Sequence, residues 1–145
     1  MRVLPDVNIL VRANEKSQGP ARSLLLAVIL DGHTLLVCDE MLVDLARVLR
    51  YPRMQDRYAL TEAQIYEYIQ FLRASSEIVT VDRTLNVPMR DPKDIVILQT
   101  AIAGEAEVIC TLDSDFYDPR TLAFCATWGI AMCTDVALMN RLRAS

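Results

Sequence analysis

The stretch RVLPDVNILV, Arg2 to Val11, decides the fold, because a short apolar run of strand length ends there at one carboxylate, Asp6. In an open sheet of parallel strands, ligands bind beyond the carboxyl ends of the strands, where the following loops and helix starts gather. Asp6 is therefore a candidate site residue. A lone Asp at a strand end is more often a helix cap, so a site requires further acids in equivalent places.

Three later acidic clusters occupy such places. They follow the apolar run TLLVC, open a predicted helix, and follow the apolar run EVICTL; their members are Asp39, Glu40 and Asp44, then Asp91 and Asp94, then Asp113 and Asp115. Four acidic groups at strand ends and helix starts are harder to explain as unrelated caps.

Strand and helix patterns alternate along the whole chain. Besides the first strand, apolar or β-branched runs predict strands at 34–38, 78–81, 107–111 and 129–133. Helices are predicted to begin at Pro20, at Asp39, after the Thr61–Gln64 capping box, at Asp91 and after Thr134, and the second of these is predicted to stop at Pro52. This alternation predicts a single domain over residues 1–145, an α/β three-layer α/β/α sandwich with a central, mostly parallel sheet of about five strands.

The composition is that of a globular protein, with 52% hydrophobic residues in 145. No apolar run reaches the ~18 residues of a membrane span, and the start does not resemble a secretory signal, so we expect a soluble, cytoplasmic protein without a membrane partner. The four cysteines form no CxxC pair and are expected to be buried. A single histidine, His33, argues against a histidine-based metal site.

The net charge of −4 argues against binding of nucleic acid over a broad basic surface. It leaves open binding through a local basic patch, because four arginines fall within eleven residues: Arg47, Arg50, Arg53 and Arg57. The alternative is a solvated helix face.

Several carboxylates without histidine suggest a particular chemistry. Two like charges ~4 Å apart repel by roughly 4 kcal/mol at an effective dielectric near 20, so protons or a cation must balance a cluster of four. Mg²⁺ and Mn²⁺ prefer oxygen ligands and often bridge protein carboxylates to substrate phosphates. A metal-dependent phosphodiesterase is the first mechanism that these residues suggest.

The order of the motifs resembles that of the PIN-domain family, in particular the toxin components of type II toxin–antitoxin pairs. The resemblance covers nearly the whole chain through the stretches DVNILV, CDEMLVDLARVLRYPRM and RDPKDIVILQTAIAGEAEVICTLDSDF. It implies that Asp6, Asp44, Asp94 and Asp113 bind one or two Mg²⁺ or Mn²⁺ ions and are catalytic, that Asp115 assists them at the metal, and that Asn8 and Thr111 support the site. The arginines from Arg47 to Arg57 are candidates for holding the RNA backbone.

The sequence departs from the family pattern at two positions. Pro5 precedes Asp6 where an aliphatic residue is usual, and because proline cannot donate to a ladder, the first strand should end or pair poorly there. Asp44 replaces a longer Glu, which shortens its reach to a metal by one methylene. Retained water could fill that gap.

The resemblance implies an endoribonuclease that leaves 5′-phosphate and 3′-hydroxyl ends, forms a homodimer and is neutralised by a cognate antitoxin protein. Two alternatives stay open. One is a PIN-like binding module with weak or no nuclease activity, which Pro5 and Asp44 would favour. The other is a structure-specific DNA nuclease of the flap type, which ranks lower because the short chain lacks additional helical regions.

Overall fold

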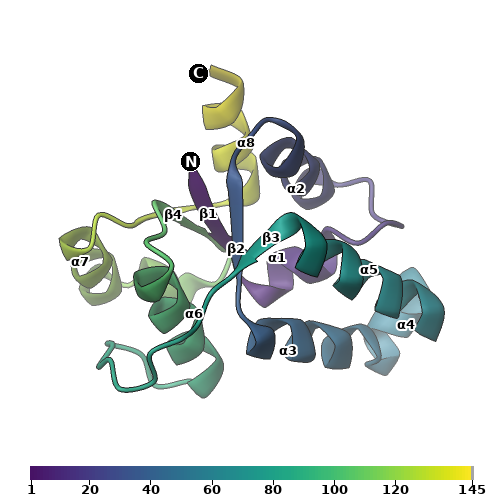
Figure 1. Ribbon diagram of the computed structural model, residues 1–145, viewed down its shortest axis with the longest axis horizontal. Coiled ribbons are helices and arrows are strands. Elements are labelled where there is room, and N and C mark those ends of the chain that lie inside the picture. Colours follow the sequence, from purple (N-terminus) through teal and green to yellow (C-terminus); the bar gives the residue numbers. More distant parts are fainter. Residues whose placement is uncertain (145) are drawn as a thin grey trace.

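A five-stranded parallel sheet forms the centre of the computed structural model, which describes residues 1–144 (Figure 1). The strands are β1 (Arg2–Pro5), β2 (Thr34–Val37), β3 (Ser76–Ile78), β4 (Val108–Cys110) and β5 (Ala131–Cys133). Their order across the sheet is β3-β2-β1-β4-β5, and each neighbouring pair is parallel. The predicted α/β class with about five strands is confirmed.

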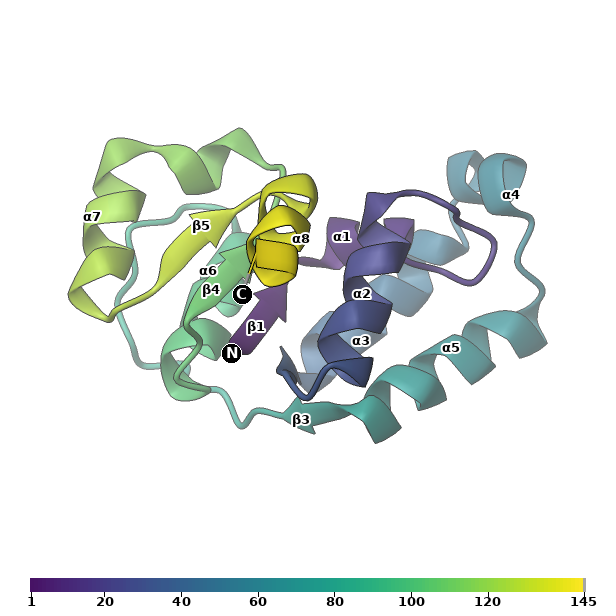
Figure 2. The same ribbon diagram turned by 90° about the horizontal axis from the view of Figure 1, so that it is seen from above.

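Helices flank this sheet, as Figure 2 shows from a second direction. They are α1 (Val7–Arg12), α2 (Pro20–Leu30), α3 (Asp39–Leu49), α4 (Pro52–Tyr58), α5 (Glu62–Ser75), α6 (Pro92–Ala103), α7 (Pro119–Thr127) and α8 (Asp135–Ala144), with a short 3₁₀ helix, η1 (Ser114–Tyr117). α2 packs against α8, and α3 packs against α1 and α5. None of the described helices is long and apolar enough to cross a membrane.

Local signals explain where the helices begin. The Thr61–Gln64 capping box forms in full at the start of α5, and the Asp91 side chain accepts from the Lys93 N–H at the start of α6. The Thr134 hydroxyl accepts from the Ala137 N–H at the start of α8. These three caps were predicted from the sequence, since each supplies an oxygen to an otherwise unpaired backbone N–H.

The core is one continuous cluster of apolar side chains on both sides of the central strands. Leu4, Leu36 and Ile109 of β1, β2 and β4 are fully buried within it. Cys38, Cys110 and Cys125 are buried as expected, whereas Cys133 is only half-buried. Burial of these strands on both faces explains why they appear in the sequence as short apolar runs without alternation.

Three elements differ from the sequence predictions: β3, α4 and α7. The strand predicted at 78–81 is instead Ser76–Ile78, because β3 follows α5 without a loop and its partner β2 ends at Val37, opposite Ile78. The predicted stop of the helix ahead of Pro52 is confirmed, since α3 ends at Leu49, but Pro52 then occupies the first turn of a further helix, α4, where its missing N–H costs nothing. Neither α4 nor α7 was predicted.

Pro5 ends β1, and its position explains why the sheet tolerates it. The Asp6 N–H donates to the Cys110 carbonyl of β4 at 2.9 Å, so position 5 would direct an N–H towards β2 instead. The register between β1 and β2 runs only through Arg2 and Val3, and Pro5 therefore breaks no ladder bond. The prediction that the first strand ends at Pro5 is confirmed.

The chain packs closely around Gly104, and this close approach can be tested. A Cβ at this position would lie 2.8 Å from Val79 Cγ2 and 3.1 Å from the Thr100 carbonyl oxygen. We expect Gly104→Ala to lower the free energy of unfolding by about 1–3 kcal/mol, measured by urea denaturation. Val79→Ala removes the closest atom, so the double variant Gly104→Ala/Val79→Ala should lose less than the sum of the single losses. A Gly104→Ala protein as stable as the wild type would contradict this close approach.

Candidate functional site

Five acids from distant parts of the chain line one pocket of about 170 Å³ beyond the carboxyl ends of β1 and β4; they are Asp6, Asp44, Asp91, Asp94 and Asp113. We call it the acid pocket. Asn8 and Lys93 also line it. Asp6 follows β1, Asp113 follows β4, Asp94 lies in the first turn of α6, and Asp44 lies within α3. β1 is central in the sheet, so helices that follow different strands present their acids to the same place.

A compact group within this region has the composition of a metal site. One carboxylate oxygen from each of Asp94, Asp113 and Asp115 lies within 4.8 Å of the others. The Asp115 N–H donates to Asp113 Oδ1 at 2.9 Å, which fixes these two residues relative to each other. Three carboxylates without nitrogen or sulfur donors suit a hard divalent cation such as Mg²⁺ or Mn²⁺. Asp6 and Asp44 are outside this group of three, although they line the same pocket.

Asp6 is buried, with 6% of its surface exposed, and its two carboxylate oxygens have different partners. Oδ1 accepts from the Ile9 N–H at 2.9 Å and so caps α1, while Oδ2 accepts from the Thr111 hydroxyl. Burial raises the pKa of Asp6 above its ordinary value; the two hydrogen bonds oppose this rise, and the nearby Asp113 adds to it. Asp6 is thus both a helix cap and a wall of the acid pocket.

Thr111 connects the ends of the two central strands. Its hydroxyl donates to Asp6 and accepts from the Asp113 N–H at 3.0 Å, and its side chain is fully buried. The Tyr117 hydroxyl donates to the Thr111 carbonyl oxygen at 2.8 Å. Thr111 therefore fixes the orientation of two of the acids.

Asp94 shows the repulsion within the acid pocket most clearly. Desolvation is the largest cause that raises the pKa of Asp94 to about 6, and the charges of Asp113, Asp91, Asp115 and Asp6 raise it further. Each cause makes the ionised form of Asp94 less favourable, and a cation beside it would reverse this effect. The carboxylates present therefore fit a divalent metal.

Asp44 differs from the other acids because cations already neutralise it. Its Oδ1 pairs with Arg47, one helical turn away, and lies 3.7 Å from the Lys93 ammonium. Lys93 was not predicted as a site residue. The only signal for it was its place in the sequence DPKD, immediately before Asp94.

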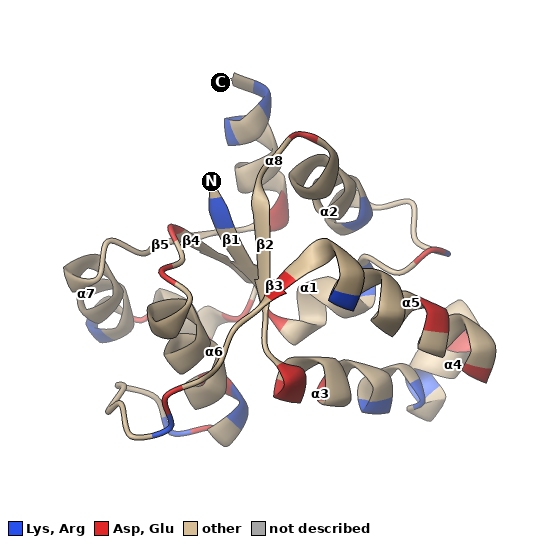
Figure 3. Ribbon diagram, in the orientation of Figure 1, with Lys and Arg blue, Asp and Glu red and all other residues tan. Residues whose placement is uncertain are grey.

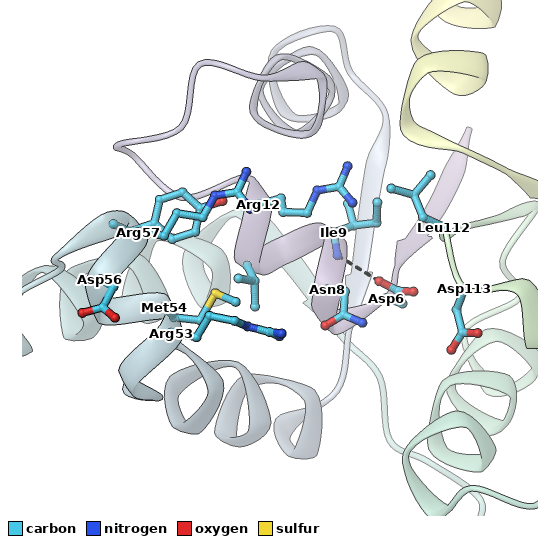
Figure 4. Close-up of a pocket in the computed structure, with 12 residues that line it drawn as sticks. Asp6, Asn8, Ile9, Arg12, Arg53, Met54, Asp56, Arg57, Leu112 and Asp113 are labelled. Carbon is cyan, nitrogen blue, oxygen red and sulfur yellow. Dashed lines mark hydrogen bonds between the residues drawn. The ribbon is translucent and has the colours of Figure 1, made fainter.

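A larger cleft of about 640 Å³ adjoins the acid pocket between α1, α4 and the loop after β4 (Figure 4). We call it the α1–α4 cleft. Asp6, Asn8 and Asp113 line both spaces, so the two are continuous. Arg53 and Arg57 line the cleft from α4, and the exposed Leu112 lines it next to Asp113. Arg47 and Arg50 do not line it.

Charged residues of both signs are interspersed over most elements (Figure 3). The net charge of the chain is −4. Any attraction for a polyanion is therefore local and depends on particular side chains near the acid pocket.

The profile of the family described as PIN domain matches residues 2–115, a span that contains every acid of the pocket. No curated protein matches the chain.

Replacing the Thr111 hydroxyl tests its connecting role. We expect Thr111→Val to lower the free energy of unfolding by about 1–3 kcal/mol, because a buried carboxylate oxygen loses its donor and the Asp113 N–H loses its acceptor. Thr111→Ser retains the hydroxyl and should fall much closer to the wild type. Equal stability of the valine and serine variants in urea denaturation at pH 7 would argue against these two hydrogen bonds.

The raised pKa of Asp94 predicts a pH dependence with a definite sign. Because the folded state holds this proton more tightly than the unfolded chain, ionisation of Asp94 destabilises the metal-free fold above about pH 6, and the effect disappears as pH falls towards 4. Asp94→Asn, which is always neutral, should raise the melting temperature in chelator at pH 7 and have little effect at pH 4. Mn²⁺ affinity of the wild type should decrease below about pH 6, because protons compete for Asp94.

Proposed function

The chain belongs to the PIN-domain family, and from this premise we propose that it is a metal-dependent endoribonuclease that hydrolyses RNA phosphodiester bonds. PIN domains are typically metal-dependent nucleases. The observation that carries the proposal is the meeting of Asp6, Asp44, Asp94 and Asp113 in one pocket. The raised pKa of Asp94 supports a cation there, because burial and neighbouring carboxylates oppose its ionisation.

In this proposal, Asp94, Asp113 and Asp115 hold a Mg²⁺ or Mn²⁺ ion, and Asp6 and Asp44 bind it or a second ion from the other walls of the pocket. The ion supplies Lewis acidity, an activated water and neutralisation of charge at phosphorus. Asp94 must lose its proton to bind a cation. Thr111 keeps Asp6 oriented through its hydroxyl, and Asn8 presents an exposed amide where Asp6 and Asp113 border the cleft.

The test is cleavage of a fluorescent single-stranded RNA, and of total RNA, with Mn²⁺ and with chelator. We expect cleavage only with the metal. Asp94→Asn and Asp6→Asn should each reduce the rate by at least about 100-fold, since each removes a charge that the site needs for the cation, while the folded structure is retained. Asp31→Asn is a matched control, because Asp31 is an exposed acid at the end of α2. Full activity of the Asp94→Asn protein would exclude the assignment.

A second candidate is a PIN-like binding module with weak or no nuclease activity. The pairing of Asp44 with Arg47 and Lys93 favours it, because these cations neutralise a carboxylate that the nuclease would use. Calorimetric titration with Mn²⁺ at neutral pH and low salt separates the two candidates. A protein that binds no ion under these conditions favours the binding module.

We further propose that the chain is the toxin component of a toxin–antitoxin pair, acting as a homodimer in the cytoplasm and neutralised by a small cognate antitoxin protein. The resemblance of its motifs to those of PIN-domain toxins supports this proposal. Induced expression should stop growth for the wild type and not for Asp94→Asn. Normal growth with an enzyme that is active in vitro would count against the toxin role.

A further inference from the structure

The α1–α4 cleft has more room than the proposed reaction needs. Its volume of about 640 Å³ is well above the 170 Å³ of the acid pocket, and it extends from Asp6 and Asp113 towards α4. Small-molecule sites occupy ~300–1,000 Å³, so this volume could hold a nucleotide or two next to the acids. Figure 4 shows Arg53 extending from α4 towards Asn8, which lies beside Asp6.

Two of the four clustered arginines are unpaired in the cleft, whereas the other two are not. Among residues 1–144, no carboxylate lies within ion-pair distance of Arg53 or Arg57. In contrast, Arg50 makes three hydrogen bonds of 2.8–3.0 Å to Glu62, and Arg47 pairs with Asp44. Arg53 and Arg57 are therefore the members of the cluster that can bind an anion without giving up a carboxylate, although the Arg57 guanidinium lies 5.4 Å from the centroid of the Tyr58 ring.

Their position on α4 lets these arginines act together. Arg53 and Arg57 are four residues apart, so they project from the same side of the helix. The Gln55 amide donates to the Leu49 and Leu60 carbonyl oxygens, at 2.9 and 3.1 Å, and so ties α4 to the chain on both sides. Lys16 adds a bond of 2.8 Å to the Ala59 carbonyl at the end of α4. Because α4 is held in this way, the backbone that carries its arginines is already in position when a ligand binds.

The other charged residues around the acid pocket favour an anionic ligand in the α1–α4 cleft over one on the opposite side of the pocket. Arg12 lines the cleft but pairs with the buried Asp135 at 3.4 Å, and Asp56 lies at the far end from Asp6 in Figure 4. A second cleft of about 400 Å³ borders the pocket on its α3 and α6 side. Its three cations are all paired: Arg47 and Lys93 with Asp44, and Arg83 with Glu40. Unpaired positive charge is thus found in the α1–α4 cleft.

Apolar side chains and the aromatic ring of Tyr58 form most of the rest of the cleft wall. Ile9 and Val11 come from α1, Met54 from α4, and Leu112 from the loop before Asp113. Leu112 is 42% exposed although it is large and apolar. A nucleotide offers both a phosphate for arginine and an apolar base face for such a wall.

We propose that the α1–α4 cleft binds the nucleotides on one side of the scissile phosphate, with Arg53 and Arg57 on their phosphates and a base against the apolar wall. This inference rests on the proposed function, since it takes the acid pocket as the place of cleavage. A base in this cleft must be unstacked and unpaired, which a duplex does not allow. A strand seated in the cleft is therefore unpaired there.

The test measures binding separately from cleavage. A fluorescent single-stranded RNA of about ten nucleotides is titrated with the full chain in Ca²⁺ and in chelator, over a range of salt, and followed by anisotropy. Each lost phosphate contact changes the slope of log K against log salt by ~0.7 for a single strand, so Arg53→Gln/Arg57→Gln should make it shallower by about 1.4. We also expect the affinity of this double variant for the RNA to be at least tenfold lower than that of the wild type.

The matched control is Arg141→Gln/Arg143→Gln, which removes the same charge from exposed arginines on α8. It should leave the slope and the affinity close to those of the wild type. The wild type should bind duplex RNA of equal length more weakly than the single strand. A slope unchanged in the α4 double variant, an equal loss in the α8 control, or a preference for duplex would each overturn the inference.

These outcomes separate the two proposals. If the wild type binds RNA as described but does not cut it with Mn²⁺, the nuclease proposal fails and the cleft remains an RNA-binding site. If the wild type cuts RNA and the α4 double variant binds and cuts equally well, the cleft inference fails and the nuclease proposal stands.

Discussion

Repulsion between carboxylates at one edge of a parallel sheet is the constraint on which the rest of this structure depends. β1 lies between β2 and β4, so the acid that follows it comes close to the acid that follows β4 and to the first turn of α6. The raised pKa of Asp94, caused by burial and by four neighbouring acids, shows where this arrangement is least favourable. Such a cluster lowers the stability of the fold, and a neutral residue in place of one of the acids would raise it. This kind of unfavourable arrangement is typical of functional sites.

Local backbone requirements and the site use the same side chains. Asp6 caps α1 through Oδ1 and accepts from Thr111 through Oδ2, and Asp113 accepts from the Asp115 N–H at the start of η1. The cap interpretation of these acids was therefore correct, and it does not exclude the site interpretation. Each cap fixes the carboxylate in one orientation before a cation binds, which reduces the cost of assembling the site.

Much of the fold followed from local signals, while contacts between distant segments did not. The capping box at Thr61, the Asp91 cap and the apolar strand runs predicted most elements, because each depends on neighbours in the sequence. β3 was misplaced because its bounds depend on where β2 ends.

α4 was missed because Pro52 was taken only as a helix stop, although proline also starts helices. Asp118 and Pro119 repeat at α7 the signal recognised at α6, so α7 could have been predicted. The position of Lys93 against Asp44 could not, since α3 and α6 meet only in the folded chain.

The net charge of −4 gives little information about nucleic-acid binding here, because pairing decides which charges are available. Most of the basic side chains around the acid pocket already neutralise a carboxylate, as Arg47, Arg83 and Lys93 do. An arginine that lies in a cleft without such a partner keeps its full attraction for phosphate, and two of them one helical turn apart on a fixed helix match a pair of phosphates. An acidic protein can therefore bind a polyanion at one place while its overall field opposes association. Its binding should be local, sensitive to salt and limited to strands that fit beside the acids.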